Sequence, residues 1–263
     1  MGTKMTTPPI FFALIQVRFN TLMALENYAN AIQETFRKQG FPDVQRGLVA
    51  TINLPIPSGN GAPPQLTQTP RYLFANMNRT AGFILEPSAI SFQTNEYDVF
   101  ETFSESFMAG LGAVHAAVDL NYLDRIGARY LDAIYPRDGE SLNDYLTPSA
   151  LGLLTKSNGG ELQYAFSESL FQKGKLSVLA RTIIQCGKIT LPVDLAQTFL
   201  TVPERFAVKD GLHAILDTDS FVDRREQFSL DRVHAQLIEL HDEITAAFRA
   251  TVTSRALEIW SEK

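Results

Sequence analysis

The sequence has little cysteine and no long apolar run. Cys186 is the only cysteine among 263 residues, so the chain can form neither an internal disulfide nor a zinc site built on several thiolates. No apolar run reaches the roughly 18 residues that a membrane-spanning helix needs. The stretch from Pro8 to Val17 is interrupted by Gln16 and lacks the layout of a signal peptide. These features predict a cytoplasmic protein with no membrane span.

An excess of positive charge is also missing. The chain has 23 Lys and Arg residues against 29 Asp and Glu residues, which gives a net charge of −6. Proteins that hold nucleic acid mainly through its phosphates depend on clustered basic residues. Neither residues 1–119, with 7 bases and 9 acids, nor residues 120–263, with 16 and 20, have such an excess. Nucleic acid is therefore not expected as a partner.

Recognised cofactor-binding, metal-binding and catalytic motifs are absent. The sequence contains no Walker-type phosphate loop, no G-x-G-x-x-G between a strand and a helix, and no H-E-x-x-H. His234 and His241 would lie two helical turns apart, about 10 Å, which is too far to ligate one ion. No G-x-S-x-G nucleophile motif occurs either. We therefore expect no metal and no cofactor, and the sequence identifies no catalytic residue.

Hydrophobic periodicity predicts an α+β protein with an antiparallel sheet and long helices. Alternating β-forming residues predict strands at residues 10–19, 44–54, 71–77, 80–85, 89–94, 121–135, 162–172 and 175–186. Apolar residues at helical spacing predict helices over residues 22–39, 97–118, 141–154 and 230–252. The stretch Pro55–Pro70 contains five prolines and is expected to be a surface loop. The turn Lys209–Gly211 predicts a hairpin within residues 205–219.

The order of these predicted elements repeats once along the chain. Each half runs strand, helix, several antiparallel strands and long helix, an order typical of helix-grip units, in which a sheet curls around the last helix. After a disordered tail at residues 1–8, residues 9–119 would form the first half and residues 120–263 the second. The halves could share one wide sheet. The alternative is a single α+β domain without internal symmetry.

Several segments resemble a known protein family. They are the start PPIFFALIQVRF, the strand DRIGARY at Asp124–Tyr130, and GLHAILDTDSF followed by a helix containing LIELHDEITAAF. Together they resemble a sporadically distributed family of uncharacterised prokaryotic proteins, over roughly Pro8 to Trp260, and Arg125–Tyr130 is the most specific part. The resemblance implies a bacterial cytoplasmic protein associated with mobile-element or defence genes. It implies no activity, cofactor or catalytic residue.

Charged residues gather on one face of several predicted strands. Because alternate residues of a strand share a face, Arg125 and Arg129 point the same way, and Gly127 between them leaves space above the sheet. If the strands are neighbours, the full set of candidate site residues on this face is Arg125, Arg129, Arg181, His213, Asp217 and Asp219.

This arginine and aspartate cluster has two interpretations. The first is a set of cross-strand ion pairs, each contributing about 0.2–1 kcal/mol. The second is a pocket for a small anion, because a guanidinium matches carboxylate or phosphate in two-point contact. In an enzyme, Asp217 or His213 would then be the general base. Both interpretations require acids or a ligand close to the arginines, because an unpaired buried charge is costly.

Two functions follow from these observations. The absence of catalytic motifs, together with a broad sheet and long helices, favours a non-enzymatic binding or assembly protein, with a protein partner or self-association. The loop Pro55–Pro70 would be its mobile element. The alternative is a small-anion binding protein or enzyme that uses the arginine and aspartate cluster.

Overall fold

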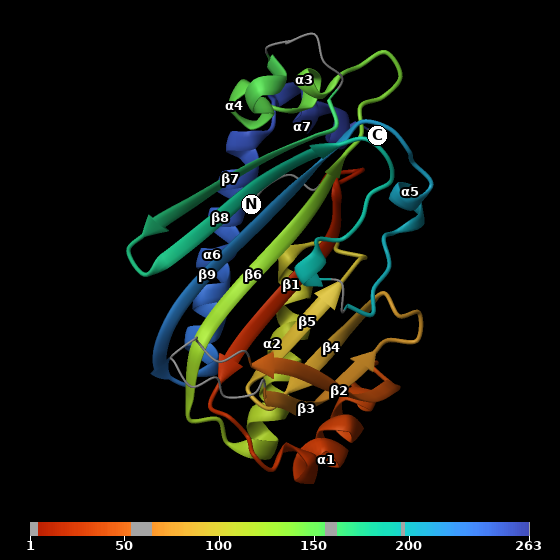
Figure 1. Ribbon diagram of the computed structural model, residues 1–263. Coiled ribbons are helices and arrows are strands. Elements are labelled where there is room, and N and C mark those ends of the chain that lie inside the picture. The colour runs from red at the N-terminus through yellow and green to blue at the C-terminus, as the bar shows by residue number, and fades with distance from the viewer. Residues whose placement is uncertain (1–4, 54–64, 156–161, 196–197, 263) are drawn as a thin grey trace.

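The computed structural model describes residues 5–53, 65–155, 162–195 and 198–262. Its strands are β1 (Ile10–Phe19), β2 (Asp43–Asn53), β3 (Gln65–Ala75), β4 (Ala81–Glu86), β5 (Ala89–Thr94), β6 (Tyr122–Ile134), β7 (Tyr164–Lys173), β8 (Leu176–Gln185) and β9 (His213–Gln227). They form one nine-stranded sheet in the order β2-β3-β4-β5-β1-β6-β9-β8-β7 (Figure 1). Every neighbouring pair is antiparallel. The predicted α+β class with an antiparallel sheet is confirmed.

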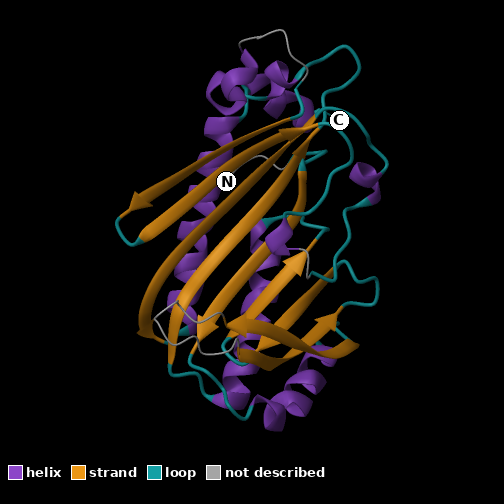
Figure 2. Ribbon diagram, viewed as in Figure 1, coloured by secondary structure: helices purple, strands orange, loops and turns teal. Residues whose placement is uncertain are grey.

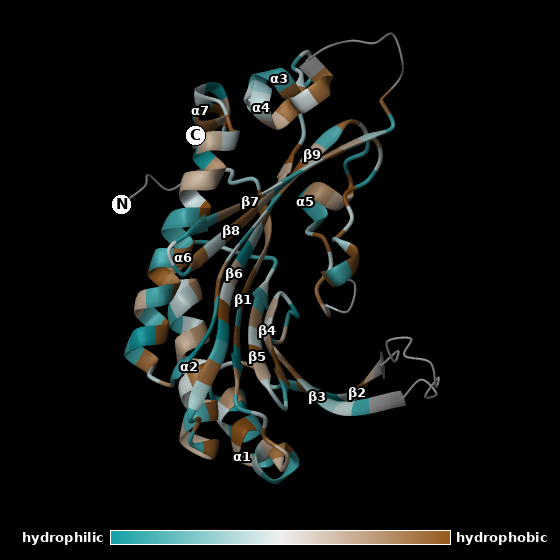
Figure 3. Ribbon diagram, turned by 60° about the vertical axis from the view of Figure 1, so that its left-hand side comes forward, coloured by the Kyte–Doolittle hydropathy of each residue, from teal (hydrophilic) through white to brown (hydrophobic). Residues whose placement is uncertain are grey.

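Three long helices cover one side of the sheet. They are α1 (Leu25–Lys38), α2 (Phe100–Val118) and α6 (Leu230–Thr251). Figure 3 shows α2 and α6 on this side, while the segment that contains α5 (Glu204–Ala207) crosses the other side. We refer to the two sides as the helical face and the opposite face. None of the helices in the described part of the chain is long and apolar enough to span a membrane.

The main core lies between the sheet and the three long helices (Figure 2). Residues Ala13, Ile15 and Val17 of β1 point into this core and are fully buried. Strand side chains alternate between faces, so the neighbouring strand β6 also sends every second residue inward, from Ile126 to Tyr130. The intervening residues of these strands, including the arginines of β6, therefore lie on the opposite face.

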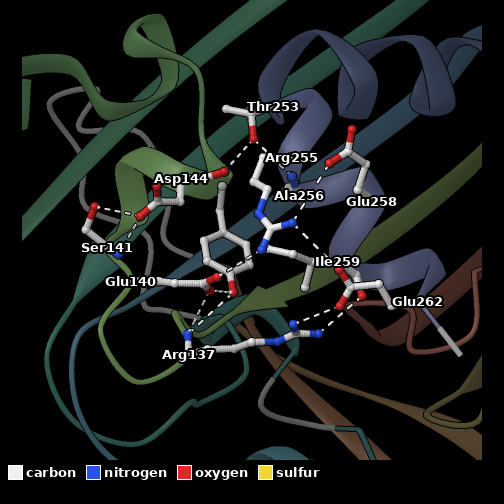
Figure 4. A network of polar contacts seen from close by, with 11 residues as sticks. Arg137, Glu140, Ser141, Asp144, Thr253, Arg255, Ala256, Glu258, Ile259 and Glu262 are labelled. Atoms are coloured by element: carbon white, nitrogen blue, oxygen red, sulfur yellow. Dashed lines mark hydrogen bonds and ion pairs between the residues drawn. The ribbon is translucent and has the colours of Figure 1, made fainter.

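The C-terminal helix α7 (Ser254–Ser261) is held at the end of the molecule by a network of polar contacts (Figure 4). Arg137, which follows β6, donates to the Glu262 carboxylate at 3.0 Å. Arg255 of α7 lies 3.6 Å from Glu140 and 3.6 Å from Glu262. The two arginines and Glu262 are half-exposed, so these ion pairs add little stability, and their effect is to orient α7.

The helix predicted over residues 141–154 is wrong as a single element. The structure has three short pieces there, α3 (Leu142–Tyr145), α4 (Pro148–Leu151) and the 3-10 turn η1 (Gly152–Thr155). A proline disfavours helical geometry in the residue before it, so Pro148 ends α3 and begins α4. The apolar residues of both helices still point inward, into a second core with α7.

Residues Met5–Pro8 of the predicted tail run beside α7. The backbone N–H of Thr7 donates to the Trp260 oxygen at 3.0 Å. The Thr6 hydroxyl donates to the backbone oxygen of Ser261 at 3.3 Å. The chain ahead of β1 is therefore bonded to the last helix.

The connection from β8 to β9 crosses the opposite face. Its helix α5 places Phe206 against Phe11, with ring centroids 6.0 Å apart. Arg205 donates to the backbone oxygen of Ile10 at 2.7 Å. The hairpin predicted for residues 205–219 is wrong, because the segment before the turn is the helix α5 and only the segment after it is a strand. Apolar contacts with the sheet determine the secondary structure of this segment, and these contacts cannot be inferred from the turn sequence.

The loop predicted over Pro55–Pro70 is shorter than expected at its far end. Strand β3 already begins at Gln65 and pairs with β2, while residues 54–64 lie outside the described residues. Pro70 is tolerated in this strand because the ladder between β3 and β4 begins only at Tyr72. The missing N–H of proline therefore costs no hydrogen bond to β4.

Candidate functional site

The predicted arginine and aspartate cluster is assembled on the opposite face of β6, β9 and β8. Arg129 of β6 grips Asp217 of β9 with two parallel bonds, Nε to Oδ1 at 2.7 Å and Nη2 to Oδ2 at 2.8 Å. Arg181 of β8 donates through Nη1 to the same Oδ2 at 3.2 Å. Arg181 and Asp217 are direct register partners, and Asp217 is diagonal to Arg129. Sheet register therefore brings these three side chains together.

Two further carboxylates complete the cluster, and the sequence analysis identified neither. Asp194, in the 3-10 turn η2 (Val193–Leu195), accepts from both terminal nitrogens of Arg129. Glu168 of β7 accepts from Nε of Arg181 at 2.7 Å. Glu168 is the register partner of Arg181, so strand alternation could have found it. Asp194 belongs to an irregular connection, and no local sequence pattern predicts the path of that connection over the sheet.

Arg125 and Asp219 form a second pair beside the first. Arg125 Nη2 donates to Asp219 Oδ2 at 3.2 Å, and the guanidinium lies over the Phe221 ring at 4.6 Å. The side chain folds across Gly127, where an added Cβ would meet Arg125 Nη1 at 2.9 Å. The space predicted above Gly127 is therefore filled by Arg125 itself.

His213 is set apart from these charges. It is fully buried, its Nδ1 lies 3.0 Å from the Gly211 oxygen, and its ring packs 4.9 Å from that of Tyr135. Its Nε2 is 3.4 Å from the amide nitrogen of Gln185. Asp217 is the fourth residue after His213 along the strand. In the described structure, the hydrogen bonds of His213 lie at the start of β9, and none of them is to a residue of the arginine and aspartate cluster.

The electrostatics show a self-neutralised group. Burial acts to lower the pKa of Arg129, but the hydrogen bonds that Arg129 donates to Asp217 and Asp194 outweigh burial and raise that pKa. The hydrogen bond from Arg129 lowers the pKa of Asp194. Burial raises the pKa of Asp219, and the charge of Arg125 offsets this only in part. Each shift follows from a partner inside the cluster or from burial of the group itself.

The cluster has no spare positive charge for an anion. Three arginines, Arg125, Arg129 and Arg181, face four carboxylates, Glu168, Asp194, Asp217 and Asp219, a balance of 3 − 4 = −1. The Arg129 side chain is 8% exposed and that of Asp217 is 1% exposed. A ligand would have to displace Asp194, whose side chain is 62% exposed, from Arg129. This geometry corresponds to the interpretation as cross-strand ion pairs.

A different surface is open. Strand β7 lies at one end of the sheet, and nearly all of its residues are exposed on both faces. Its four large apolar side chains are Tyr164, Phe166, Leu170 and Phe171, which are 73%, 55%, 63% and 60% exposed. In Figure 1 the hairpin of β7 and β8 projects beyond the body of the sheet. We call the outer side of this strand the β7 edge.

Comparisons with known proteins identify no relative of this chain. No family model, no curated protein and no solved structure matches it. The resemblance noted from the sequence therefore stays a prediction. Among the described residues, no group of three or more His, Cys, Asp or Glu side chains is placed to hold a metal ion.

Proposed function

We propose that this protein is a non-enzymatic binding or assembly protein and that its partner is a second copy of the chain, joined at the β7 edge. The observation that carries the proposal is the open ten-residue edge strand with four exposed large apolar side chains. Edge strands of stable monomers are usually protected by charge, proline, bulges or covering segments. The β7 edge carries only Glu168 and Lys173 as charges, and the described chain does not cover it.

We infer in addition that the halves are tandem helix-grip-like copies related by a two-fold axis through the sheet centre. In both halves the first strand pairs with the last strand before the long helix, β1 with β5 and β6 with β9. The segments IQVRF (15–19) and IGARY (126–130) align with an offset of 127 − 16 = 111. Gln16 and Gly127 are also direct partners across β1 and β6. A two-fold axis at that pair carries each residue of β1 onto the residue of β6 that lies 111 positions later, which is the offset of the sequence alignment.

This symmetry predicts which kind of element would pair with the β7 edge. It equates β5 with β9, β4 with β8 and β3 with β7. In the first half, β3 is covered by the antiparallel strand β2. The described part of the second half contains short helices in place of such a strand. The edge of β7 is thus a strand position that is occupied in one half and open in the other, and its expected occupant is an antiparallel strand.

A second copy supplies an antiparallel strand by symmetry alone. Two β7 strands related by a two-fold axis perpendicular to the sheet run antiparallel, and two-fold dimers are the commonest soluble oligomers. With the axis at Ser169, Glu168 lies opposite Leu170 of the second copy. With the axis at Ser167, Glu168 lies opposite Phe166. Both registers keep the two Glu168 carboxylates apart and cover apolar side chains.

The test is the mass of the protein in solution. Light scattering coupled to gel filtration should show a dimer for the wild type. The double variant Phe166→Glu/Leu170→Glu should be a monomer, because each register then places glutamates opposite each other, which is destabilising. Met23→Glu/Met77→Glu is the matched control, since these side chains are 93% and 85% exposed and lie away from β7.

The control variant should remain a dimer, and both variants should keep the circular dichroism spectrum of the wild type. A wild-type monomer at all concentrations would reject self-association as the function. A dimer that the glutamates in β7 leave intact would reject the β7 edge as its interface.

A further inference from the structure

A pocket of about 330 Å³ lies at the other end of the sheet, on the opposite face. It is formed by β2, β3 and β4 and by Phe199 from the connection between β8 and β9. Figure 3 shows β2 and β3 curling away from the helices, toward the side on which α5 lies. We call this hollow, between Gly47, Leu73 and Phe199, the corner pocket. It is far along the sheet from the β7 edge and independent of it.

Strand register explains which side chains line the corner pocket. Gly47 is paired with Arg71, and Leu73 is paired with Ile84, so these residues share one face. The neighbours of Leu73 and Ile84 in β3 and β4 point into the helical core. Phe199 approaches closely because Gly82 has no side chain: an added Cβ there would meet the Phe199 ring at 2.9 Å. The pocket is therefore a built feature of the sheet, with apolar walls.

The charges of the corner pocket differ from those of the arginine and aspartate cluster. Arg71 and Arg79 point into it, whereas the side chain of Arg46, another lining residue, lies on the helical face, 5.8 Å from the Tyr72 ring and paired with Glu26. No Asp or Glu is among the described residues of the lining. The acidic neighbours of these two arginines approach from outside the lining: Glu86 lies 3.8 Å from Arg71 and Asp43 lies 3.0 Å from Arg79. A guanidinium carries five N–H donors, so it can bind a second anion beside the first.

The floor of the corner pocket is left open by glycine. An added Cβ at Gly47 would meet nothing within 4 Å, and the backbone there is ordinary strand. A side chain at this position would therefore occupy the hollow without straining the fold. Valine would even suit a strand better than glycine.

We propose that the corner pocket binds a small organic anion, with its phosphate or carboxylate group held by Arg71 and Arg79 and its apolar body placed against Leu73, Ile84 and Phe199. Planar guanidinium groups recognise carboxylate and phosphate through paired bonds. The volume lies at the lower end of the range of ligand sites, which are typically apolar with a few polar groups that orient the ligand. A small aromatic or aliphatic anion fits this combination.

The test uses phenyl phosphate and benzoate as probes in isothermal titration calorimetry with the full chain. Phenyl phosphate should bind with a dissociation constant of about 1 mM or tighter. Inorganic phosphate should bind about tenfold more weakly, because it cannot use the apolar walls. Benzyl alcohol, which has the ring without the charge, should not bind. Comparing phenyl phosphate with benzoate shows which anion the site prefers.

Two variants locate the binding. Gly47→Val fills the floor and should abolish binding of phenyl phosphate while keeping the thermal midpoint of the wild type. Arg71→Gln should weaken binding about tenfold or more, because it removes a charged donor. The control is Arg225→Gln, which removes an exposed arginine paired with Asp124 at 2.6 Å, away from the pocket, and should leave binding unchanged.

The proposal is overturned if neither phenyl phosphate nor benzoate binds, or if benzyl alcohol binds as well as phenyl phosphate. Binding that persists in Gly47→Val would also overturn it, because the anion would then lie elsewhere. These outcomes are independent of the oligomeric state, so failure here leaves the β7 edge untouched.

Discussion

Removing Arg129 tests how the sheet tolerates its buried charges. The substitution Arg129→Met keeps the length and apolar stem of the side chain but removes the two bonds to Asp217 and those to Asp194. Asp217, which is 1% exposed, then keeps one side-chain bond, from Arg181 at 3.2 Å. The Asp217 carboxylate therefore stays buried but loses two of its hydrogen bonds and the adjacent positive charge of Arg129.

The expected cost is large for a single substitution. Breaking a buried ion pair by removing one partner typically costs about 3–5 kcal/mol. The contact from Arg181 remains, so the free energy of unfolding should fall by about 3 kcal/mol. In Arg129→Met/Asp217→Leu both charges are gone, and apolar replacement of a buried pair is often neutral. The double variant should therefore be about 2 kcal/mol more stable than Arg129→Met.

Urea unfolding, followed by circular dichroism and by Trp260 fluorescence, measures these changes. Because dimerisation would make stability depend on concentration, the series is best made in the Phe166→Glu/Leu170→Glu background. The control is Arg225→Met, whose partner is Asp124. The side chains of that pair are 65% and 38% exposed, so its loss should reduce the free energy of unfolding far less than the loss of Arg129 does.

Two outcomes would refute this reasoning. If Arg129→Met costs no more than Arg225→Met, burial does not make the cluster costly to break. If the double variant is less stable than Arg129→Met, the unpaired carboxylate of Asp217 is not the origin of the loss.

Two further predictions concern the helical face. Gly110→Ala in α2 would place a Cβ 2.3 Å from the buried Phe83 ring, so urea unfolding should show that the free energy of unfolding falls by about 1–3 kcal/mol. Gly112→Ala, whose Cβ would meet nothing within 4 Å, should raise it by about 0.5–1 kcal/mol. Equal effects of the two substitutions would contradict this packing. Burial raises the pKa of Asp132 from 3.8 to about 7, so the folded state keeps a proton that the unfolded chain releases. The free energy of unfolding should therefore fall between about pH 4 and pH 7, by at most about 1.4 kcal/mol per pH unit. Burial lowers the pKa of His241, so His241 makes the free energy of unfolding rise with pH in the acid range, opposite to Asp132. The difference in the free energy of unfolding between wild type and Asp132→Asn therefore isolates the effect of Asp132. A difference that does not change with pH would contradict the prediction.

Local periodicity was sufficient for the most regular elements. The predicted strand 10–19 and the helix beginning after Ser229 are confirmed in their bounds or nearly so. The hairpin of β7 and β8 is confirmed as well, with Gly174 at a φ of 62° in its turn. In each case the residues that decide the element are neighbours in the chain. Alternation along β6 also placed Arg125 and Arg129 on one face, as expected.

The failures lie where distant contacts decide. Residues 205–207 form a helix because Phe206 packs on the first strand, which the turn sequence after it does not reveal. Asp194 reaches Arg129 through an irregular connection across the sheet.

The sequence by itself determined the class of the fold, the faces of individual strands and the charge that these faces carry, because side-chain alternation and helical spacing are local properties. Only the tertiary structure decided the order of the nine strands. That order brings Arg125, Arg129 and Arg181 beside four carboxylates, places Arg71 and Arg79 at a pocket and leaves β7 with a strand on one side only. Strand order depends on pairing between segments far apart in the chain, and no local pattern records which segments will pair.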